Sequence, residues 1–120
     1  MLKKTTAKSL HPYNQLFKML NDPNRLRILL YLKNEELCVC NLMSLLDMSQ
    51  PAVSQQLKKL REASLINMRR QNQWKFYRLN DNFPYLDLLM KILNELPDIS
   101  HEIDALTADG TRVVCTVMER

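Results

Sequence analysis

Residues 35–65 read as two short helices joined by a tight turn, and this unit constrains the fold more than any other stretch. In the second helix Ser49 is a good N-cap, and Pro51 follows in the first turn, where its missing N–H costs little. Three apolar residues then recur at helical spacing on one face, namely Val53, Leu57 and Leu60. Two amphipathic helices this close in sequence predict a helix-turn-helix.

The opposite face of the second helix is polar and basic. Short hydrogen-bonding side chains flanked by lysine suit a helix that lies in the major groove of DNA. An ordinary solvated face is the alternative, because polar outer faces are usual on amphipathic helices. The candidate DNA-binding residues of this helix are Ser49, Gln50, Ser54, Gln55 and Lys58. If this face reads DNA, double-stranded DNA is the expected partner.

Two runs after the second helix alternate in the manner of β-strands. Residues 65–70 and 74–79 place apolar side chains at every second position, as at Ile66 and Met68. Between the runs, Asn72 tolerates the positive φ that a tight hairpin turn needs. The hairpin carries three further candidate DNA contacts, namely Arg70, Gln73 and Lys75. The predicted fold class is therefore mainly α with a small β-hairpin, a winged helix-turn-helix.

Four separated motifs resemble the ArsR/SmtB family of metal-sensing repressors. They are Asp-Pro-Asn-Arg-Leu-Arg-Ile-Leu at 22–29, Glu-Leu-Cys-Val-Cys-Asn-Leu at 36–42, Ser-Gln-Pro-Ala-Val-Ser-Gln-Gln-Leu at 49–57, and the hairpin at 70–79. The similarity covers residues 10–96, and the motifs occur in the family's order. It implies a dimeric winged helix that binds operator DNA when metal-free and releases it on binding its ion.

The chain of 120 residues suits a single winged helix-turn-helix domain. Its core is expected over residues 10–96, while the polar, basic stretch 1–9 is expected to be loose. In the C-terminal extension, 97–120, residues 98–106 predict a weak further helix and 113–117 have strand composition. A net charge of +4 is compatible with a polyanionic partner.

Several protein classes are disfavoured by what the sequence lacks. The N-terminus has no apolar segment like that of a signal peptide, and no run reaches membrane length, so we expect a cytoplasmic protein with reduced cysteines. No glycine-rich phosphate loop, pair of metal-binding histidines or nucleophile elbow occurs. We expect no enzymatic activity, and a small thiol enzyme is the remote alternative.

The segments that flank the helix-turn-helix predict a dimer. Apolar residues of 83–96 spread around most of a helix that Asp81 or Asn82 can cap. A helix that is apolar on more than one face needs two partners. One is the winged-helix core, and we expect the other to be the same helix of a second subunit, beside a first helix near 13–20.

A further helix is predicted to begin at Asp22, with Pro23 in its first turn. It carries Arg25 and Arg27. Single basic residues give little functional signal, so we expect both to be solvated surface charges. Contacts with DNA phosphate are the alternative.

Cys38 and Cys40 stand at the start of the first helix of the helix-turn-helix, which is expected over residues 38–48. Thiolates are the preferred ligands of soft ions, and a helix N-terminus lowers the pKa of a thiol. Residues two apart on a regular helix point about 200° apart, so both thiols reach one ion only if the first turn unwinds. On spacing alone, two small buried hydrophobic residues are the better interpretation. The match to the family motif instead favours an ion site.

The resemblance implies As(III) or Sb(III) as the effector. Arsenic sensors of the family often have a third cysteine where this chain has Met43, and cadmium and lead sensors add cysteines that this chain lacks before Cys38. An ion that needs few thiolates therefore fits best, with Cys115 as the candidate third ligand. The alternative is a repressor of the same fold that senses Cd, Pb, Zn or thiol oxidation.

Overall fold

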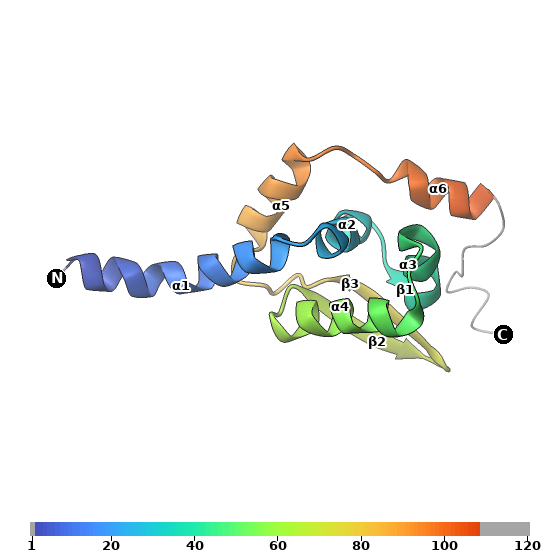
Figure 1. The fold of residues 1–120 in the computed structure, drawn as a ribbon, viewed down its shortest axis with the longest axis horizontal. Coiled ribbons are helices and arrows are strands. Elements are labelled where there is room, and N and C mark those ends of the chain that lie inside the picture. The colour runs from blue at the N-terminus through green and yellow to red at the C-terminus, as the bar shows by residue number, and fades with distance from the viewer. Residues whose placement is uncertain (1, 109–120) are drawn as a thin grey trace.

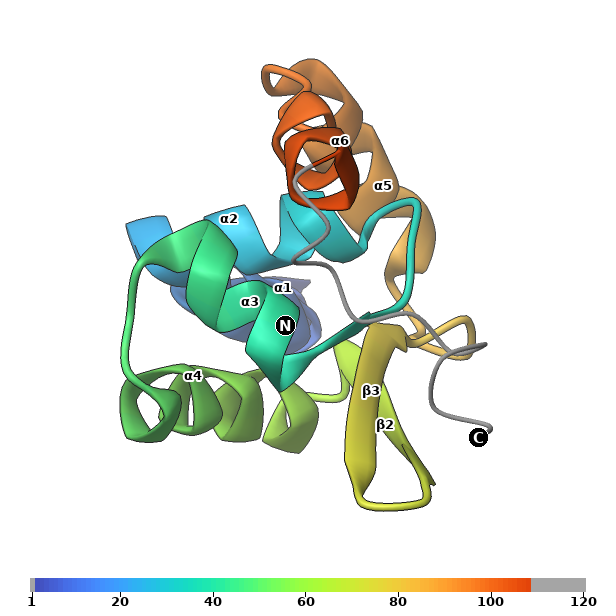
Figure 2. The same cartoon turned by 90° about the vertical axis from the view of Figure 1, so that its right-hand side faces the viewer.

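A computed structural model describes residues 2–108, which form six helices and one three-stranded antiparallel sheet (Figure 1). The elements in chain order are α1 Leu2–Leu20, α2 Pro23–Leu32, β1 Leu37–Cys38, α3 Val39–Leu46, α4 Gln50–Glu62, β2 Ile66–Gln71, β3 Trp74–Leu79, α5 Leu86–Glu95 and α6 His101–Ala108. The hairpin of β2 and β3, here called the wing, projects beyond α4 (Figure 2). The predicted winged helix-turn-helix is confirmed.

Side-chain caps set the starts of the two helices that matter most for the fold. The Asp22 carboxylate accepts hydrogen bonds from the backbone N–H groups of Asn24, at 2.9 Å, and Arg25, at 3.0 Å. The Ser49 hydroxyl accepts one from the N–H of Ala52 at 3.4 Å. Both caps satisfy donors that the first turn of a helix leaves free, as the sequence predicted.

Three residues other than glycine take a positive φ in the tight turns. The angles are 53° at Asp47, 67° at Ser64 and 58° at Asn72. Asparagine and aspartate tolerate this region better than most residues, so the prediction for Asn72 is confirmed. The left-handed residue Asp47 caps the end of α3 and begins the three-residue connection, residues 47–49, to α4.

The main core lies between α2, α3, α4 and one face of the sheet. The apolar stripe predicted for α4 is fully buried there, because Val53, Leu57 and Leu60 have exposed fractions of 0–1%. The buried residues that surround the stripe include Ile28, Leu29, Leu42, Leu65 and Tyr77. This packing turns the other face of α4 toward solvent, where the predicted DNA-reading residues lie.

The sheet has one more strand than the sequence predicted. β1 pairs antiparallel with β3, with Leu37 opposite Tyr77 and Cys38 opposite Phe76, and the strand order is β1-β3-β2. Two residues are too few to show an alternating pattern, so only their pairing with a distant strand reveals them. The expectation that Cys38 begins a helix over 38–48 is therefore wrong, because the helix is α3, Val39–Leu46.

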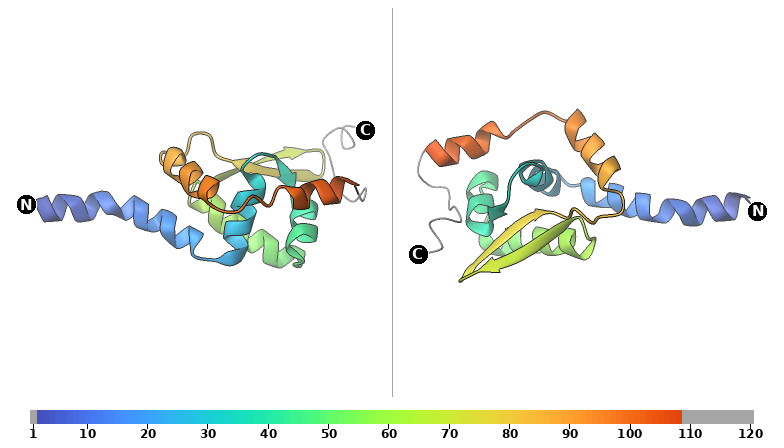
Figure 3. Two further views of the ribbon diagram at one scale, coloured as in Figure 1. Left: turned by 90° about the horizontal axis from the view of Figure 1, so that it is seen from above. Right: turned by 180° about the vertical axis from the view of Figure 1, so that it is seen from behind.

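Helix α1 is longer than the sequence predicted. It begins at Leu2, so the expectation that residues 1–9 are loose is wrong for the backbone from Leu2 onward. Residues 2–10 include three Lys, two Leu and one Ala, which favour a helix, and Pro12 is accommodated inside it. Figure 3 shows α1 standing out from the rest of the chain in both views.

Helix α5 begins at Leu86, later than the predicted start near Asp81. Asn80 directs a turn here instead, because its side chain accepts from the N–H of Asn82 at 3.0 Å and its carbonyl from that of Phe83 at 3.0 Å. The predicted C-terminal helix exists as α6, whereas the predicted strand at 113–117 lies outside the described residues.

Helix α6 packs against the helix-turn-helix through a polar network. The Tyr31 hydroxyl hydrogen-bonds the Glu102 carboxylate, while Ile103 is buried in the main core. Arg27 donates to Tyr31 at 2.7 Å and to the Leu45 carbonyl at 2.9 Å, and it pairs with Glu102 at 3.4 Å. Arg27 thus joins α2, α3 and α6, so the expectation of a simple solvated charge is wrong.

Arg25 is also not a solvated charge. It is only 8% exposed, and its guanidinium donates to the carbonyls of Met19, at 2.8 Å, and Lys18, at 3.2 Å, near the C-terminus of α1. It also donates to the side-chain oxygen of Gln56 on α4 at 3.1 Å and pairs with Asp22 at 3.7 Å. Arg25 therefore fastens α1, α2 and α4 together.

Replacing this arginine should destabilise the fold strongly. We expect Arg25→Ala to lower the free energy of unfolding by about 2–4 kcal/mol, because it leaves part-buried acceptors on α1, on α4 and at Asp22 without their donor. Urea unfolding at one fixed protein concentration measures the change. Arg78→Ala is the matched control, since Arg78 is exposed and its pair with Asp81 spans only three residues. Equal losses in the two variants would contradict the assigned role of Arg25.

Candidate nucleic-acid interface and thiol site

The polar residues predicted to read DNA lie together on the outer face of α4. All of them are exposed, namely Ser49, Gln50, Ser54, Gln55 and Lys58. Ser49 combines this position with its role as N-cap. Gln56, by contrast, turns inward and is held by Arg25. The sequence pattern thus separated the exposed face of α4 correctly from the buried one.

A groove between α4, the wing and the start of α3 brings several of these residues together. Its walls include Gln50, Ser54, Lys58 and Arg61 from α4, Gln73 and Lys75 from the wing, and Cys38, Cys40 and Met43 from β1 and α3. The predicted residues Ser49, Gln55 and Arg70 are exposed but do not line it. We call it the α4–wing groove.

Arg61 was not among the residues predicted from sequence. It follows Ser54 and Lys58 at positions i+7 and i+3, which places all three on the same face of α4. Its side chain adds a third cation to the α4–wing groove beside Lys58 and Lys75. The helical spacing of Arg61 from Ser54 and Lys58 could have identified it from the sequence.

The two cysteines lie where β1 meets α3. Cys38 has extended backbone angles, with φ −91° and ψ 168°, and occupies the N-cap position, while Cys40 lies in the first turn of α3. They are therefore not two positions of one regular helix, and the predicted opposition of their side chains does not apply.

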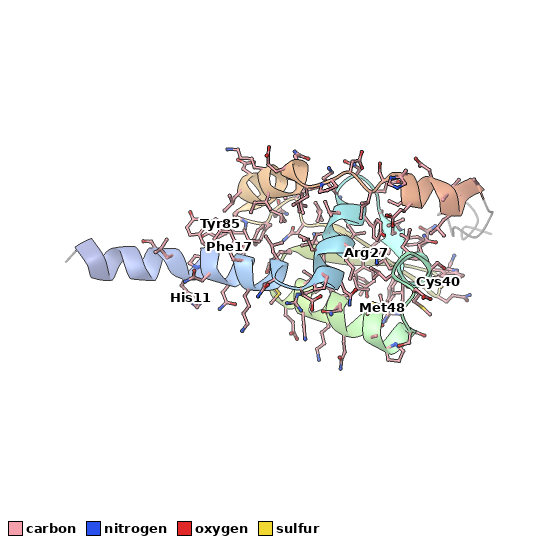
Figure 4. All side chains as sticks on the ribbon, turned by 45° about the horizontal axis from the view of Figure 1, so that its top comes forward. His11, Phe17, Arg27, Cys40, Met48 and Tyr85 are labelled. Carbon is pink, nitrogen blue, oxygen red and sulfur yellow. The ribbon has the colours of Figure 1, made fainter. Side chains whose placement is uncertain are left out.

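The two thiols differ in exposure. Cys38 is 1% exposed, whereas Cys40 lies on the surface, where Figure 4 shows it at the α3 end of the molecule, away from His11. Cys38 packs with Phe76 and the half-buried Trp74 in a small cluster that is separate from the main core. One thiol is thus open to an incoming ion, and the other lies behind the aromatic residues of β3.

Burial raises the pKa of the Cys38 thiol above its usual value. The backbone N–H of Asn41 acts in the opposite direction, and the nearby Cys40 thiol raises the pKa of Cys38 further. The expectation that the helix N-terminus favours the thiolate is therefore wrong for Cys38, because desolvation outweighs the backbone donors. Burial thus favours the neutral thiol of Cys38 over its thiolate.

The donor set matches an ion that binds few thiolates. Cys38 and Cys40 are two residues apart in the chain and line the same groove, with Cys38 buried and Cys40 exposed. Among residues 2–108, no group of three or more His, Cys, Asp and Glu side chains gathers at one place. Cys115, the candidate third ligand, lies outside the described residues.

An apolar surface lies at the other end of the molecule, on α1 and next to α5. Leu10 and Phe17 of α1 are 48% and 49% exposed, which is unusual for large apolar side chains. The ring of Tyr13 on α1 packs against that of Tyr85, just before α5, in a tilted arrangement with centroids 4.8 Å apart. Figure 4 shows Phe17 and Tyr85 on this side, far from Cys40.

No helix within residues 2–108 is long and apolar enough to cross a membrane.

Comparison with known proteins gives relatives that are named as regulators of arsenic resistance. Residues 22–68 match the family model described as bacterial regulatory protein, arsR family. The chain is 49% identical to the arsenical resistance operon repressor of Escherichia coli K12, over 58% of this chain and 61% of the repressor. It is 44% identical to the arsenic resistance transcriptional regulator ArsR1 of Pseudomonas putida, over 63% of this chain and 61% of that protein. The chain thus spans about three fifths of the length of both relatives.

Solved structures agree with the sequence comparison. HlyU from Vibrio cholerae N16961 is 36% identical, and the match covers 71% of this chain and 95% of that one with a TM-score of 0.62. The residues that match the family model run from the N-cap of α2 to the middle of β2 and so include the whole helix-turn-helix. The chain belongs to the arsR family of bacterial regulatory proteins.

Proposed function

We propose that this protein is a homodimeric, metalloid-responsive transcriptional repressor. It binds operator DNA through α4 and the wing and releases it when As(III) or Sb(III) binds Cys38 and Cys40. One observation carries the proposal, namely that both cysteines line the same groove as Ser54, Lys58 and Lys75. An ion at one wall of the α4–wing groove therefore acts directly on the surfaces that would face DNA.

The proposed DNA contacts divide into two kinds. Gln55 and its exposed neighbours on α4 would read base edges in the major groove, since a glutamine amide can bond adenine bidentately. Lys58, Arg70 and Lys75 would meet phosphates, and Gln73 at the tip of the wing would add a polar contact. Exposure of all these residues, the net charge of +4 and family membership support this assignment.

The chemistry of trivalent arsenic suits a pair of thiols. Arsenous acid exchanges a hydroxyl for each thiolate, and each thiol proton leaves with that hydroxyl as water. Two As–S bonds then form without any net ionisation, so the raised pKa of Cys38 is no obstacle. The names of the Escherichia coli and Pseudomonas putida relatives support arsenic as the effector. We keep Cys115 as the proposed third ligand.

A release titration tests the proposed function. Fluorescence anisotropy would follow a labelled operator fragment, selected from random DNA, while As(III), Sb(III), Cd(II), Pb(II), Zn(II) or peroxide is added at fixed salt. We expect As(III) and Sb(III) to release the DNA at the lowest concentrations. Release by the divalent ions alone would refute the assigned effector.

Thiol oxidation is the second candidate signal, and the position of Cys38 and Cys40 in the lining of one groove favours it. Peroxide would take one hydrogen from each thiol and leave a disulfide with two molecules of water. Intact-mass analysis distinguishes this outcome from an arsenic adduct. Release that follows peroxide but not arsenite would select the oxidation sensor.

We further propose that the homodimer forms through α5 and α1. Light scattering at micromolar concentration should then give twice the chain mass of 14.2 kDa. We expect Phe17→Asp to shift the equilibrium toward monomer, because a charge replaces an exposed apolar side chain of the proposed interface. Ser44→Asp adds the same charge on the exposed surface of α3 and should remain dimeric. A wild-type protein that is only monomeric would rule out the dimer.

A further inference from the structure

One row of residues crosses all three strands of the sheet. Cys38 on β1 lies opposite Phe76 on β3, and Phe76 lies opposite Arg69 on β2. Residues directly opposite in antiparallel strands project from the same face of the sheet. The Cys38 thiol, the Phe76 ring and the Arg69 side chain therefore share one face.

Arg69 is held tightly at the end of this row. Its guanidinium lies over the Phe76 ring, with Cζ 4.8 Å from the ring centroid. Its Nε donates to both carboxylate oxygens of Glu36, at 2.8 and 3.0 Å, and a second nitrogen donates at 2.7 Å. Since Glu36 directly precedes β1, this ion pair bridges β3 and joins the two outer strands.

We propose that the Glu36–Arg69 pair is a latch that keeps Cys38 covered and transmits occupation of Cys38 to the wing. In this inference, which rests on the proposed function, Arg69 is a positioning residue and not an ion ligand. The closed latch holds Phe76 over the thiol and holds the wing in the position that suits DNA. An ion that bonds Cys38 favours the open latch.

Because β1 is short, its attachment to the sheet depends on contacts such as the Glu36–Arg69 pair. Two residues at the edge of a sheet form a marginal strand, so contacts outside the ladder decide how firmly it stays attached. Phe76 belongs to the same strand as Trp74 and Lys75, which line the α4–wing groove. A reagent reaches the 1% exposed Cys38 only after this row opens, and opening displaces the base of the wing.

Alkylation of Cys38 measures the opening directly. In the Cys40→Ser/Cys115→Ser background Cys38 is the single cysteine of the chain, so iodoacetamide reports on this thiol alone. We expect Glu36→Gln and Arg69→Gln each to accelerate alkylation about threefold to tenfold, as loss of a half-exposed ion pair and a cation–π contact predicts. The double variant should be no faster than the faster single variant, because both changes break one contact.

Arg78→Gln is the matched control for this experiment. It removes a positive charge from β3, where Arg78 pairs with Asp81 three residues away, and the alkylation rate should stay within about twofold of the parent. Unchanged rates in Glu36→Gln and Arg69→Gln would overturn the latch. If the accelerations of alkylation caused by the two single changes multiply in the double variant, the two residues act independently. The Glu36–Arg69 ion pair would then not be what covers Cys38.

Arsenite release with the natural cysteines tests transmission to the wing. Glu36→Gln removes a negative charge, so electrostatics alone predicts tighter DNA binding and a higher arsenite midpoint for release. The latch predicts a lower midpoint, by about threefold or more, because the open state is already favoured. If arsenite releases the wild-type protein and the midpoint of Glu36→Gln is unchanged or higher, the latch does not transmit occupation of Cys38 to the wing.

A wild-type protein that arsenite does not release would instead refute the proposed function, and the transmission step with it. The alkylation rates then decide separately whether the Glu36–Arg69 pair covers Cys38. Failure of the latch and failure of the arsenic response are thus distinguishable.

Discussion

Replacing both Cys38 and Cys40 by serine should abolish arsenite-driven release of operator DNA. In the wild-type protein we expect arsenite to lower operator affinity by about 5- to 150-fold, the usual range of coupling between two sites. The double variant should show no such change at the same arsenite concentrations, because a serine hydroxyl is a poor ligand for a thiophilic ion. Anisotropy titrations with and without arsenite at fixed salt give both affinities.

The two single variants and one control sharpen this experiment. Cys40→Ser changes an exposed residue, whereas Cys38→Ser places a hydroxyl at a position that is 1% exposed, so Cys38→Ala should accompany it. Each should bind DNA and fail to respond. Cys115→Ser tests the proposed third ligand, and we expect a partial effect or none. If the double cysteine variant still responds at wild-type arsenite concentrations, the sensing site lies elsewhere.

Operator binding should depend on Gln55 and Lys58 in two different ways. Gln55→Ala should cost about 1–3 kcal/mol and relax specificity at one base position, because a bidentate contact with a base is lost. Lys58→Ala should weaken binding to all sequences and reduce the slope of log affinity against log salt by about one for each lysine removed. Salt titrations on the selected operator and on single-base variants separate the two effects.

Lys33→Ala is the matched control, since Lys33 is partly exposed at the C-cap of α2 and its replacement removes the same charge outside α4, the wing and the proposed dimer helices. Its operator affinity and salt slope should stay near those of the wild type. Unchanged affinity in both Gln55→Ala and Lys58→Ala would show that α4 is not the reading helix. The proposed contacts of the wing would then need to be tested alone.

The sequence alone was sufficient wherever a signal and its partner lie close together in the chain. Asp22 and Ser49 cap helices through N–H groups two or three residues away, so their neighbours decide the outcome. Alternation in the wing and the apolar stripe of α4 also repeat over a few residues, and both predictions are correct. Helix periodicity likewise identified which face of α4 is exposed.

Contacts between distant segments decided what the sequence predicted wrongly. Arg25 is buried because carbonyls of α1 and a side chain of α4 converge on it, and no local pattern reports that convergence. The start of α5 was placed too early because Asn80 bonds the following turn, which a capping pattern at Asp81 or Asn82 does not reveal.

The thiol site shows the same division. The motif Glu-Leu-Cys-Val-Cys identified Cys38 and Cys40 from sequence, because their identity and spacing are local properties. Only the tertiary structure decided that Cys38 is an edge-strand residue whose neutral thiol is buried against Phe76, 38 positions further along the chain. Burial depends on everything that packs around a side chain, so desolvation outweighed the local effect of the helix N-terminus on Cys38.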